Sequence, residues 1–236
     1  MMHLIDDEAQ KEIAKKIDEA VARVLKNSVS HGNEEALTSA LGQNLAEQSF
    51  SSGDLKVNFN YRQLNKCTEE KHAGADGGFL VKVKNLNETV EKVALFQAKK
   101  LCTRKSSIRS SSMSTAESKR LAEQCKKMLQ YTEDSVAMFY TEDQIYIIDA
   151  EDFDLSNVNS PTMPLSNKHR LITLGTYLGK WLPRCTRGDT NKDLFERVKH
   201  LDGFKYGLSM TVISEKPSVN WPDDDNDDSK RSKSKR

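Results

Sequence analysis

The sequence lacks the features that mark a membrane or secreted protein. None of its 236 residues lies in an apolar run long enough to span a bilayer. The first residues include Asp6, Asp7 and Glu8, a charge pattern that does not suit a signal peptide. We therefore expect a cytoplasmic protein with no membrane contact.

Cysteine pairs at metal-binding spacing are also missing. The chain has four cysteines with no CxxC spacing, namely Cys67, Cys102, Cys125 and Cys185. Scattered cysteines without a secretion signal indicate free thiols in a reducing compartment, and they argue against a zinc site.

A strong overall charge is absent as well. The net charge is only +1, which excludes a simple global attraction to nucleic acid. The charge is unevenly spread, however, because residues 99 to 127 carry nine Lys and Arg against two Glu, a local balance of +7. We find no internal repeat, zinc finger, RNA-binding signature or clear helix-turn-helix, so nothing indicates a domain that reads base sequence.

One stretch, residues 72 to 100, brings together side chains suited to a metal and a phosphate. Asp76 precedes two glycines and a strand-like run, and a polar turn then leads to a second apolar run that ends in Gln97, Ala98 and Lys99. Residues two apart on a strand point to the same face, so Gln97 and Lys99 should project together. If the two runs pair as a hairpin, Asp76 reaches the same place. Oxygen ligands beside an ammonium group are what a hard divalent cation and a phosphate require.

This spacing resembles the PD-(D/E)xK nuclease superfamily, the restriction-endonuclease-like fold, over roughly residues 33 to 150. Asp76 matches the motif aspartate, Gln97 stands at the D/E position and Lys99 at the motif lysine. The glutamine form is similar to methyl-directed restriction and antiviral-defence effector nucleases. The resemblance implies a Mg²⁺ or Mn²⁺ ion held by Asp76 and Gln97, with Lys99 orienting the attacking water.

A helix expected over residues 33 to 48 adds a third candidate metal ligand. Its apolar stripe is Leu37, Leu41 and Leu45. Glu34 lies on that stripe, and an acid on the buried edge of a helix needs a reason. In the resembled family a glutamate on the first core helix often completes the metal site, so Glu34 is the candidate and Glu35 the fallback. The alternative is that both acids simply favour the positive end of the helix.

The hydrophobic patterns predict an α/β fold with a mixed central sheet flanked by helices. The expected elements are a helix over 33–48, strands over 55–61, 78–84 and 92–98, a helix over 115–131, and a hairpin of 136–140 with 144–149. Helix, three strands, helix and strand form the αβββαβ core of the resembled fold. We assign residues 28–150 to this core.

The segments on either side are expected to be additions to the core. Residues 1–27 should form an amphipathic helix that packs on the core or docks a partner, with its stripe at Ile13, Ile17, Val21, Val24 and Leu25. Residues 151–215 should be a C-terminal extension packed on the core, with helices over 171–182 and 193–201 and a late strand over 206–213. Residues 216–236 read as a disordered tail.

A serine-rich basic segment follows the candidate site. Residues 101 to 114 contain six serines and three basic residues, a composition typical of a mobile loop. Beside a metal site such a loop could follow a phosphate backbone, so the candidate nucleic-acid contacts are Lys100, Arg104, Lys105 and Arg109. The alternative is a flexible linker without contacts.

These patterns and the resemblance predict a metal-dependent endonuclease that hydrolyses phosphodiester bonds. DNA is favoured as its substrate, and the choice between DNA and RNA stays open. Analogy with the resembled family adds a role as effector of a prokaryotic antiviral-defence system, controlled by homo-oligomerisation or by a regulatory protein partner. Two alternatives remain open. One is a catalytically inactive nucleic-acid-binding module, which the neutral Gln97 favours; the other is a structural subunit of a larger complex, which the N-terminal helix favours.

Overall fold

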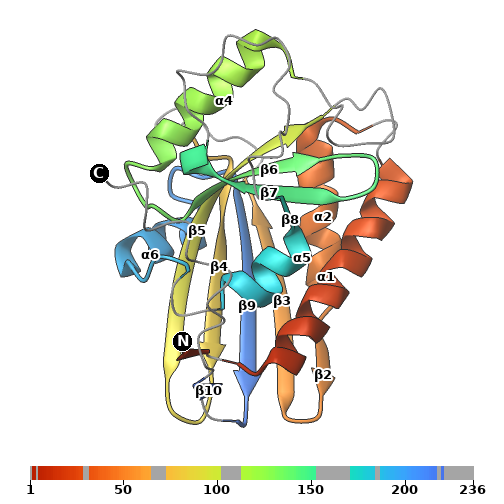
Figure 1. Cartoon of the computed structure of the whole chain (residues 1–236), viewed down its shortest axis with the longest axis vertical. Helices are drawn as coiled ribbons and strands as arrows, with labels where there is room; N and C mark the ends of the chain where they lie inside the picture. Colours follow the sequence, from red (N-terminus) through yellow and green to blue (C-terminus); the bar gives the residue numbers. More distant parts are fainter. Residues whose placement is uncertain are drawn as a thin grey trace.

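The structure, a computed structural model, describes residues 2–3, 5–28, 32–64, 73–101, 113–152, 171–183, 187–216 and 219–220. These residues form an α/β fold in which a mixed eight-stranded sheet carries helices on both faces (Figure 1). The helices are α1 (Asp7–Ser28), α2 (Glu34–Ala46), α4 (Thr115–Met128), α5 (Leu174–Thr176) and α6 (Lys192–His200). The strands of the sheet are β2 (Phe50–Ser52), β3 (Leu55–Gln63), β4 (Gly77–Lys84), β5 (Thr89–Lys100), β6 (Ser135–Tyr140), β7 (Ile145–Asp149), β8 (Ile172–Thr173) and β9 (Tyr206–Ser214).

The strand order is β2-β3-β9-β4-β5-β6-β7-β8. The strands predicted near 55–61, 78–84 and 92–98 are confirmed as β3, β4 and β5. β9 comes from the segment expected to be a C-terminal extension, yet it lies inside the sheet between β3 and β4. It runs antiparallel to β3 and parallel to β4. The first and second predicted core strands are therefore not paired with each other.

The β4–β5 hairpin is the centre of the sheet and carries the candidate motif. Its register places Gly77 opposite Phe96, and Lys84 opposite Thr89 at the turn. Asn85 closes that turn, because its Oδ1 accepts hydrogen bonds from the backbone nitrogens of two following residues at 2.9 Å. β5 is buried on both faces from Lys92 to Ala98, as expected for a central strand.

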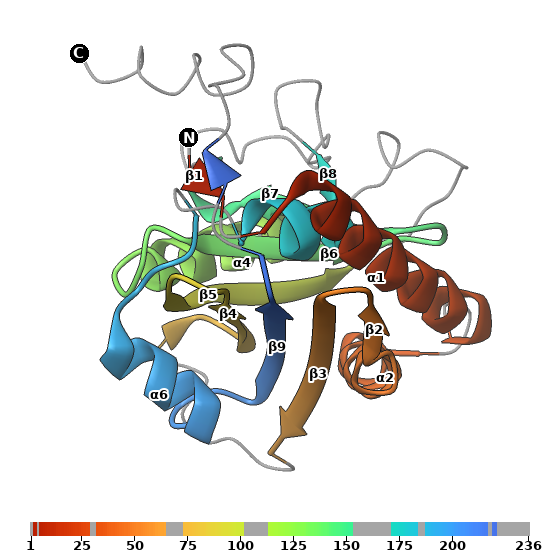
Figure 2. The ribbon, with the colours of Figure 1, turned by 90° about the horizontal axis from the view of Figure 1, so that it is seen from below.

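Two hydrophobic layers cover the sheet (Figure 2). On one face α1, α2 and α5 pack against alternate residues of the strands, and the predicted stripe of α1 is fully part of this core. On the other face α4 and α6 pack against the intervening residues, including Val93 and Leu95 of β5. Ala98 belongs to the α1–α2 layer, which leaves Gln97 and Lys99 facing the α4 side.

Side-chain caps fix the starts of the two helices nearest the motif. Asn33 caps α2 by accepting a 2.8 Å hydrogen bond from the Ala36 nitrogen. Ser114 begins α4 in a capping box with Glu117, each side chain bonding the other's backbone nitrogen. These caps determine which residues of each helix lie beside the end of β5.

Three segments differ from the sequence-based expectation. Residues 171–182, expected to be one helix, form the short β8, the single turn α5 and a π-helical turn, Tyr177–Trp181. This segment packs closely on α1, because a Cβ at Gly179 would lie 2.6 Å from the Ala14 nitrogen. The short β2, for which no strand was expected, pairs with β3. Val219–Asn220 (β10), from the expected tail, pairs with Met2–His3 (β1), and of the rest of that tail only Lys216 lies among the described residues.

No helix in the described part of the chain has both the length and the apolar character that a membrane crossing requires.

Candidate functional site

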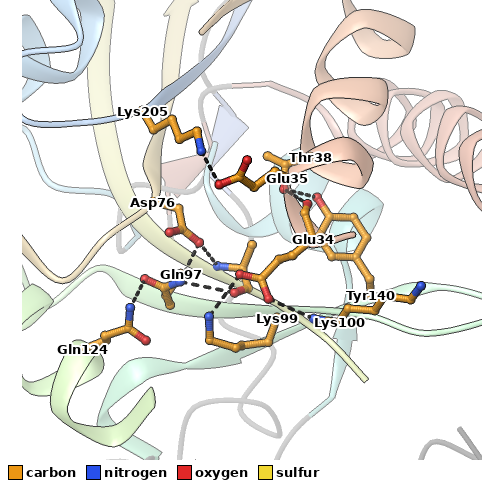
Figure 3. A network of polar contacts seen from close by, with 11 residues as sticks. Glu34, Glu35, Thr38, Asp76, Gln97, Lys99, Lys100, Gln124, Tyr140 and Lys205 are labelled. Carbon is orange, nitrogen blue, oxygen red and sulfur yellow. Dashed lines mark hydrogen bonds and ion pairs between the residues drawn. The ribbon is translucent and has the colours of Figure 1, made fainter. Parts of the chain in front are cut away.

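A pocket of about 340 Å³ lies where β4 begins and β5 ends, between the first turns of α2 and the middle of α4. Its lining residues are mostly polar: Glu34, Glu35, Thr38, Ala75, Asp76, Gln97, Lys99, Glu117, Arg120, Gln124, Lys205 and Tyr206. The structure thus brings Asp76, Gln97, Lys99 and Glu34 together, as the sequence spacing predicts (Figure 3).

The Asp76 carboxylate is fixed against the end of β5. Its Oδ2 accepts hydrogen bonds from the Ala98 backbone nitrogen at 2.9 Å and from Nε2 of Gln97 at 2.5 Å. The backbone nitrogen of Asp76 donates to the Phe96 carbonyl at 3.0 Å. Because main-chain bonds hold both sides of the contact, Asp76 and Gln97 cannot drift apart without opening the hairpin.

Gln97 presents its amide nitrogen to Asp76, and its oxygen points the other way. Oε1 accepts a 2.9 Å hydrogen bond from Nε2 of Gln124 on α4 (Figure 3). Gln97 is only 1% exposed, so both contacts are made away from bulk water. A cation bound at Asp76 would need the Gln97 oxygen, which a half-turn of the amide group would supply.

Lys99 is held beside these groups by the acid from α2. Its Nζ lies 3.1 Å from Oε1 of Glu34, and the other Glu34 oxygen accepts from the Lys100 backbone nitrogen at 3.3 Å. The Lys99 side chain is 13% exposed, so the ammonium group is largely inside the pocket. Glu34 therefore contacts the end of β5 directly, beyond any effect on its own helix.

The fallback residue Glu35 reaches the pocket through a different cation. Its Oε1 lies 2.5 Å from Nζ of Lys205, the residue just before β9 (Figure 3). The backbone nitrogens of Lys205 and Tyr206 both donate to the Asp76 carbonyl, at 3.0 and 3.1 Å. Glu34 and Glu35 thus pair with separate lysines on opposite sides of Asp76 in the view of Figure 3.

Burial dominates the titration of both acids at the centre of the site. Burial raises the pKa of Asp76 above its ordinary value, although the charge of Lys99 and the hydrogen bonds from Ala98 and Gln97 oppose the rise. Burial also raises the pKa of Glu34, again opposed by Lys99. Proton uptake at these positions is therefore easier than at an exposed carboxylate, which is typical of a functional site.

The glycines before and in β4 serve close packing. A Cβ at Gly77 would lie 2.4 Å from the Tyr206 carbonyl oxygen, and one at Gly78 would lie 2.6 Å from a Val198 methyl of α6. Only a residue without a side chain permits these approaches, so Gly77 lets β9 lie alongside the start of β4 and Gly78 lets α6 pack there.

Of the four predicted phosphate contacts, only Lys100 lies among the described residues. Nζ of Lys100 donates to the Gly32 carbonyl at 2.7 Å, which directs this side chain toward the segment before α2. Arg104, Lys105 and Arg109 lie outside the described residues, so their role stays a prediction.

Sequence reasoning missed several polar residues of the pocket, among them Gln124 and Lys205. Gln124 carried a readable signal, since it lies three residues after Leu121 and four before Met128, both buried. An amide on the buried edge of a helix needs a partner, as Glu34 does. Lys205 carried no such signal, because its place beside Asp76 depends on the pairing of β9 with β4.

The donor set suits a hard cation only if the amide oxygen and water take part. Among the described residues no three His, Cys, Asp or Glu side chains form a metal-binding group. Two carboxylates and one amide nevertheless offer oxygen ligands. They match Mg²⁺, which is usually held by one or two carboxylates and keeps several waters. Asp76, Glu34 and Gln97 would hold it.

Comparison with known proteins gives no relative: no protein-family model matches the chain, and neither does any curated protein or solved structure. The fold and the pocket define an α/β protein with a polar, charged site at the end of its central hairpin. Its function has to be inferred from that site.

Proposed function

We propose that the chain is a metal-dependent nuclease that hydrolyses phosphodiester bonds, with DNA as the favoured substrate. The observation that carries this proposal is the meeting of Asp76, Gln97, Lys99 and Glu34 in one pocket. Apart from the short β2 after α2, the order α2, β3, β4, β5, α4 and β6 along the chain supports the further proposal of a restriction-endonuclease-like core.

Each residue has a separate task in this proposal. A Mg²⁺ or Mn²⁺ ion held by Asp76, Glu34 and Gln97 would supply an activated water and would neutralise charge on the phosphoryl oxygens. Asp76 and Glu34 provide carboxylate ligands, and Gln97 provides its amide oxygen after a rotation that breaks its bond to Asp76. Lys99, released from Glu34, orients the attacking water and stabilises the charge that develops on phosphate.

Affinity for nucleic acid would come mainly from phosphate contacts, which carry no base information. The +7 balance of residues 99 to 127 lies directly after the motif strand and fits this purpose. Because the chain shows no reader of base sequence, we propose that a regulatory partner or self-association controls it, as in defence effectors of the resembled family.

A catalytically inactive nucleic-acid-binding module is the second candidate. It is favoured by one observation: Gln97 turns its nitrogen, which cannot bind a cation, toward Asp76. The two candidates share the basic segment of residues 99 to 127 and differ in metal binding.

The deciding experiment titrates the full chain with Mn²⁺ and Mg²⁺ by calorimetry, and incubates plasmid DNA and structured RNA with each metal or with EDTA. The nuclease proposal predicts metal binding that Asp76→Asn weakens, and cleavage that EDTA abolishes. Nucleic-acid binding without metal binding or cleavage would establish the second candidate instead.

A further inference from the structure

We propose that Lys205 is a second phosphate-binding cation of the pocket, and that Glu35 occupies it until a nucleic-acid backbone displaces the carboxylate. The inference rests on the proposed function to the extent that the ligand is a nucleic-acid phosphate.

The backbone of Lys205 is positioned by Asp76 itself. The amides of Lys205 and Tyr206 both donate to the Asp76 carbonyl, at 3.0 and 3.1 Å, and β9 then continues parallel to β4 from the pairing of Tyr206 with Gly77. The start of the Lys205 side chain is therefore tied to the proposed metal ligand by main-chain hydrogen bonds. A group held in this way is organised before a ligand arrives.

The side chain of Lys205 is sheltered, whereas its partner is not. Lys205 is 13% exposed and its Nζ lies 5.5 Å from the centre of the Tyr206 ring, while the Glu35 side chain is 66% exposed. Water screens the exposed carboxylate of this ion pair, which weakens its attraction to the lysine. Glu35 can thus return to water at little cost, and Lys205 keeps its place on the pocket wall.

The other cations of the pocket complete a path for a backbone. Lys99 belongs to β5 and Arg120 to α4, so the three cations come from three different elements around Asp76. In Figure 3 Lys205 and Lys99 lie on opposite sides of Asp76. A phosphate at Asp76 would be approached from both sides, with one carboxylate, Glu34 or Glu35, leaving each lysine.

A purely structural role for Lys205 makes a different prediction. If the lysine served only to hold the first turn of α2 through Glu35, removing either partner would have the same effect. If Glu35 competes with phosphate for Lys205, removing the two partners has opposite effects.

The test measures binding of the full chain to fluorescent single-stranded DNA, duplex DNA and RNA by anisotropy, in EDTA and over a range of KCl concentrations. Lys205→Ala should weaken binding about 5- to 10-fold and make the salt dependence shallower by about 0.7 to 0.9 in slope. Glu35→Gln should tighten binding, and this gain should vanish in the double variant. Lys205→Met, which keeps the apolar stem, should behave like Lys205→Ala.

Lys84→Ala is the matched control, because Lys84 is an exposed lysine at the opposite end of β4. It removes the same charge and should leave affinity and slope almost unchanged. The proposal is overturned if Lys205→Ala and Lys205→Met match Lys84→Ala, if Glu35→Gln tightens binding equally without Lys205, or if no nucleic acid binds.

The outcomes also separate this inference from the proposed function. If binding depends on Lys205 but no cleavage occurs in Mg²⁺ or Mn²⁺, the nuclease proposal is wrong and the phosphate-binding role of Lys205 is supported. If the chain cleaves nucleic acid with a metal but the Lys205 variants bind with unchanged affinity, the nuclease proposal is supported and the role of Lys205 is wrong.

Discussion

Nε2 of Gln97 lies 2.5 Å from Oδ2 of Asp76, although the two residues are 21 positions apart in the chain. The hairpin register brings the two side chains together. Because the contact is buried, the carboxylate needs a protein partner in place of water. An amide nitrogen satisfies a buried carboxylate in the absence of a cation, whereas an amide oxygen is needed in its presence. Under the proposed function, the contact would therefore break when a cation binds at Asp76.

Gln97→Glu should convert this hydrogen bond into a repulsion. Two adjacent carboxylates cannot both ionise freely without a cation, so the variant should be less stable than wild type by about 1–3 kcal/mol in EDTA. Mn²⁺ should then raise its melting temperature more than that of wild type. Thermal unfolding in EDTA and in Mn²⁺ measures both effects.

Gln130→Glu is the control for that variant, because it adds the same charge at an exposed position after α4. A similar response to Mn²⁺ in the two variants would mean that the Gln97 position does not touch a metal.

Gln124→Ala should show that the glutamine pair stabilises the site. It leaves Oε1 of the buried Gln97 without its donor, and an unsatisfied buried acceptor costs about 1–3 kcal/mol. Urea unfolding measures the loss. Glu123→Ala, on the exposed side of the same helix, should change stability by less than about 0.5 kcal/mol. Equal losses of stability in the two variants would show that the hydrogen bond from Gln124 to Gln97 does not stabilise the site.

Asp76→Asn should stabilise the protein at neutral pH. Burial raises the pKa of Asp76 in the folded state above that of the unfolded chain, so folding favours the protonated form. The stabilisation from this proton is fully present below the unfolded pKa of about 4, and it is lost as pH rises through the folded pKa. Asparagine does not ionise, so the variant's advantage over wild type should grow as pH rises from 4 to 8.

Urea unfolding across this pH range, with Asp54→Asn as an exposed control, measures the advantage. A difference between Asp76→Asn and wild type that stays constant with pH would contradict the burial argument.

The sequence predicted the elements that carry a periodic pattern of apolar residues or a clear helix cap. β3 alternates buried and wet residues, β5 is buried on both faces, and α4 begins at a capping box, so each element is visible locally. The position of β9 was not predictable. Its residues look like a strand, but its neighbours β3 and β4 are more than a hundred residues away, and no local pattern specifies them.

In the site, too, local patterns predicted some features, whereas others depend on long-range contacts. The meeting of Asp76, Gln97 and Lys99 was predictable from the two-residue strand period and the hairpin, and Glu34 from its place on a buried stripe. Which atom of Gln97 faces Asp76 was not, because that choice depends on the donor from Gln124. Lys205 enters the pocket only through the insertion of β9.

The basic segment after β5 gives a further prediction. A triple variant, Arg104→Ala, Lys105→Ala and Arg109→Ala, should bind DNA more weakly and with a shallower salt dependence, because fewer counterions are released. It should still cleave at saturating DNA, since the proposed metal ligands are intact. An unchanged salt slope would identify the segment as a linker without contacts.

The most direct test of the central claim is the cleavage rate at saturating DNA in Mg²⁺ for wild type, Lys99→Ala and the control Lys84→Ala. We predict that wild type cleaves and that EDTA stops it. Lys99→Ala should lose about 10²- to 10³-fold in rate at saturating DNA, where a loss of affinity does not limit the rate, and Lys84→Ala should match wild type. No cleavage of DNA or RNA by wild type in Mg²⁺ or Mn²⁺, or cleavage by Lys99→Ala at the wild-type rate, would contradict the account.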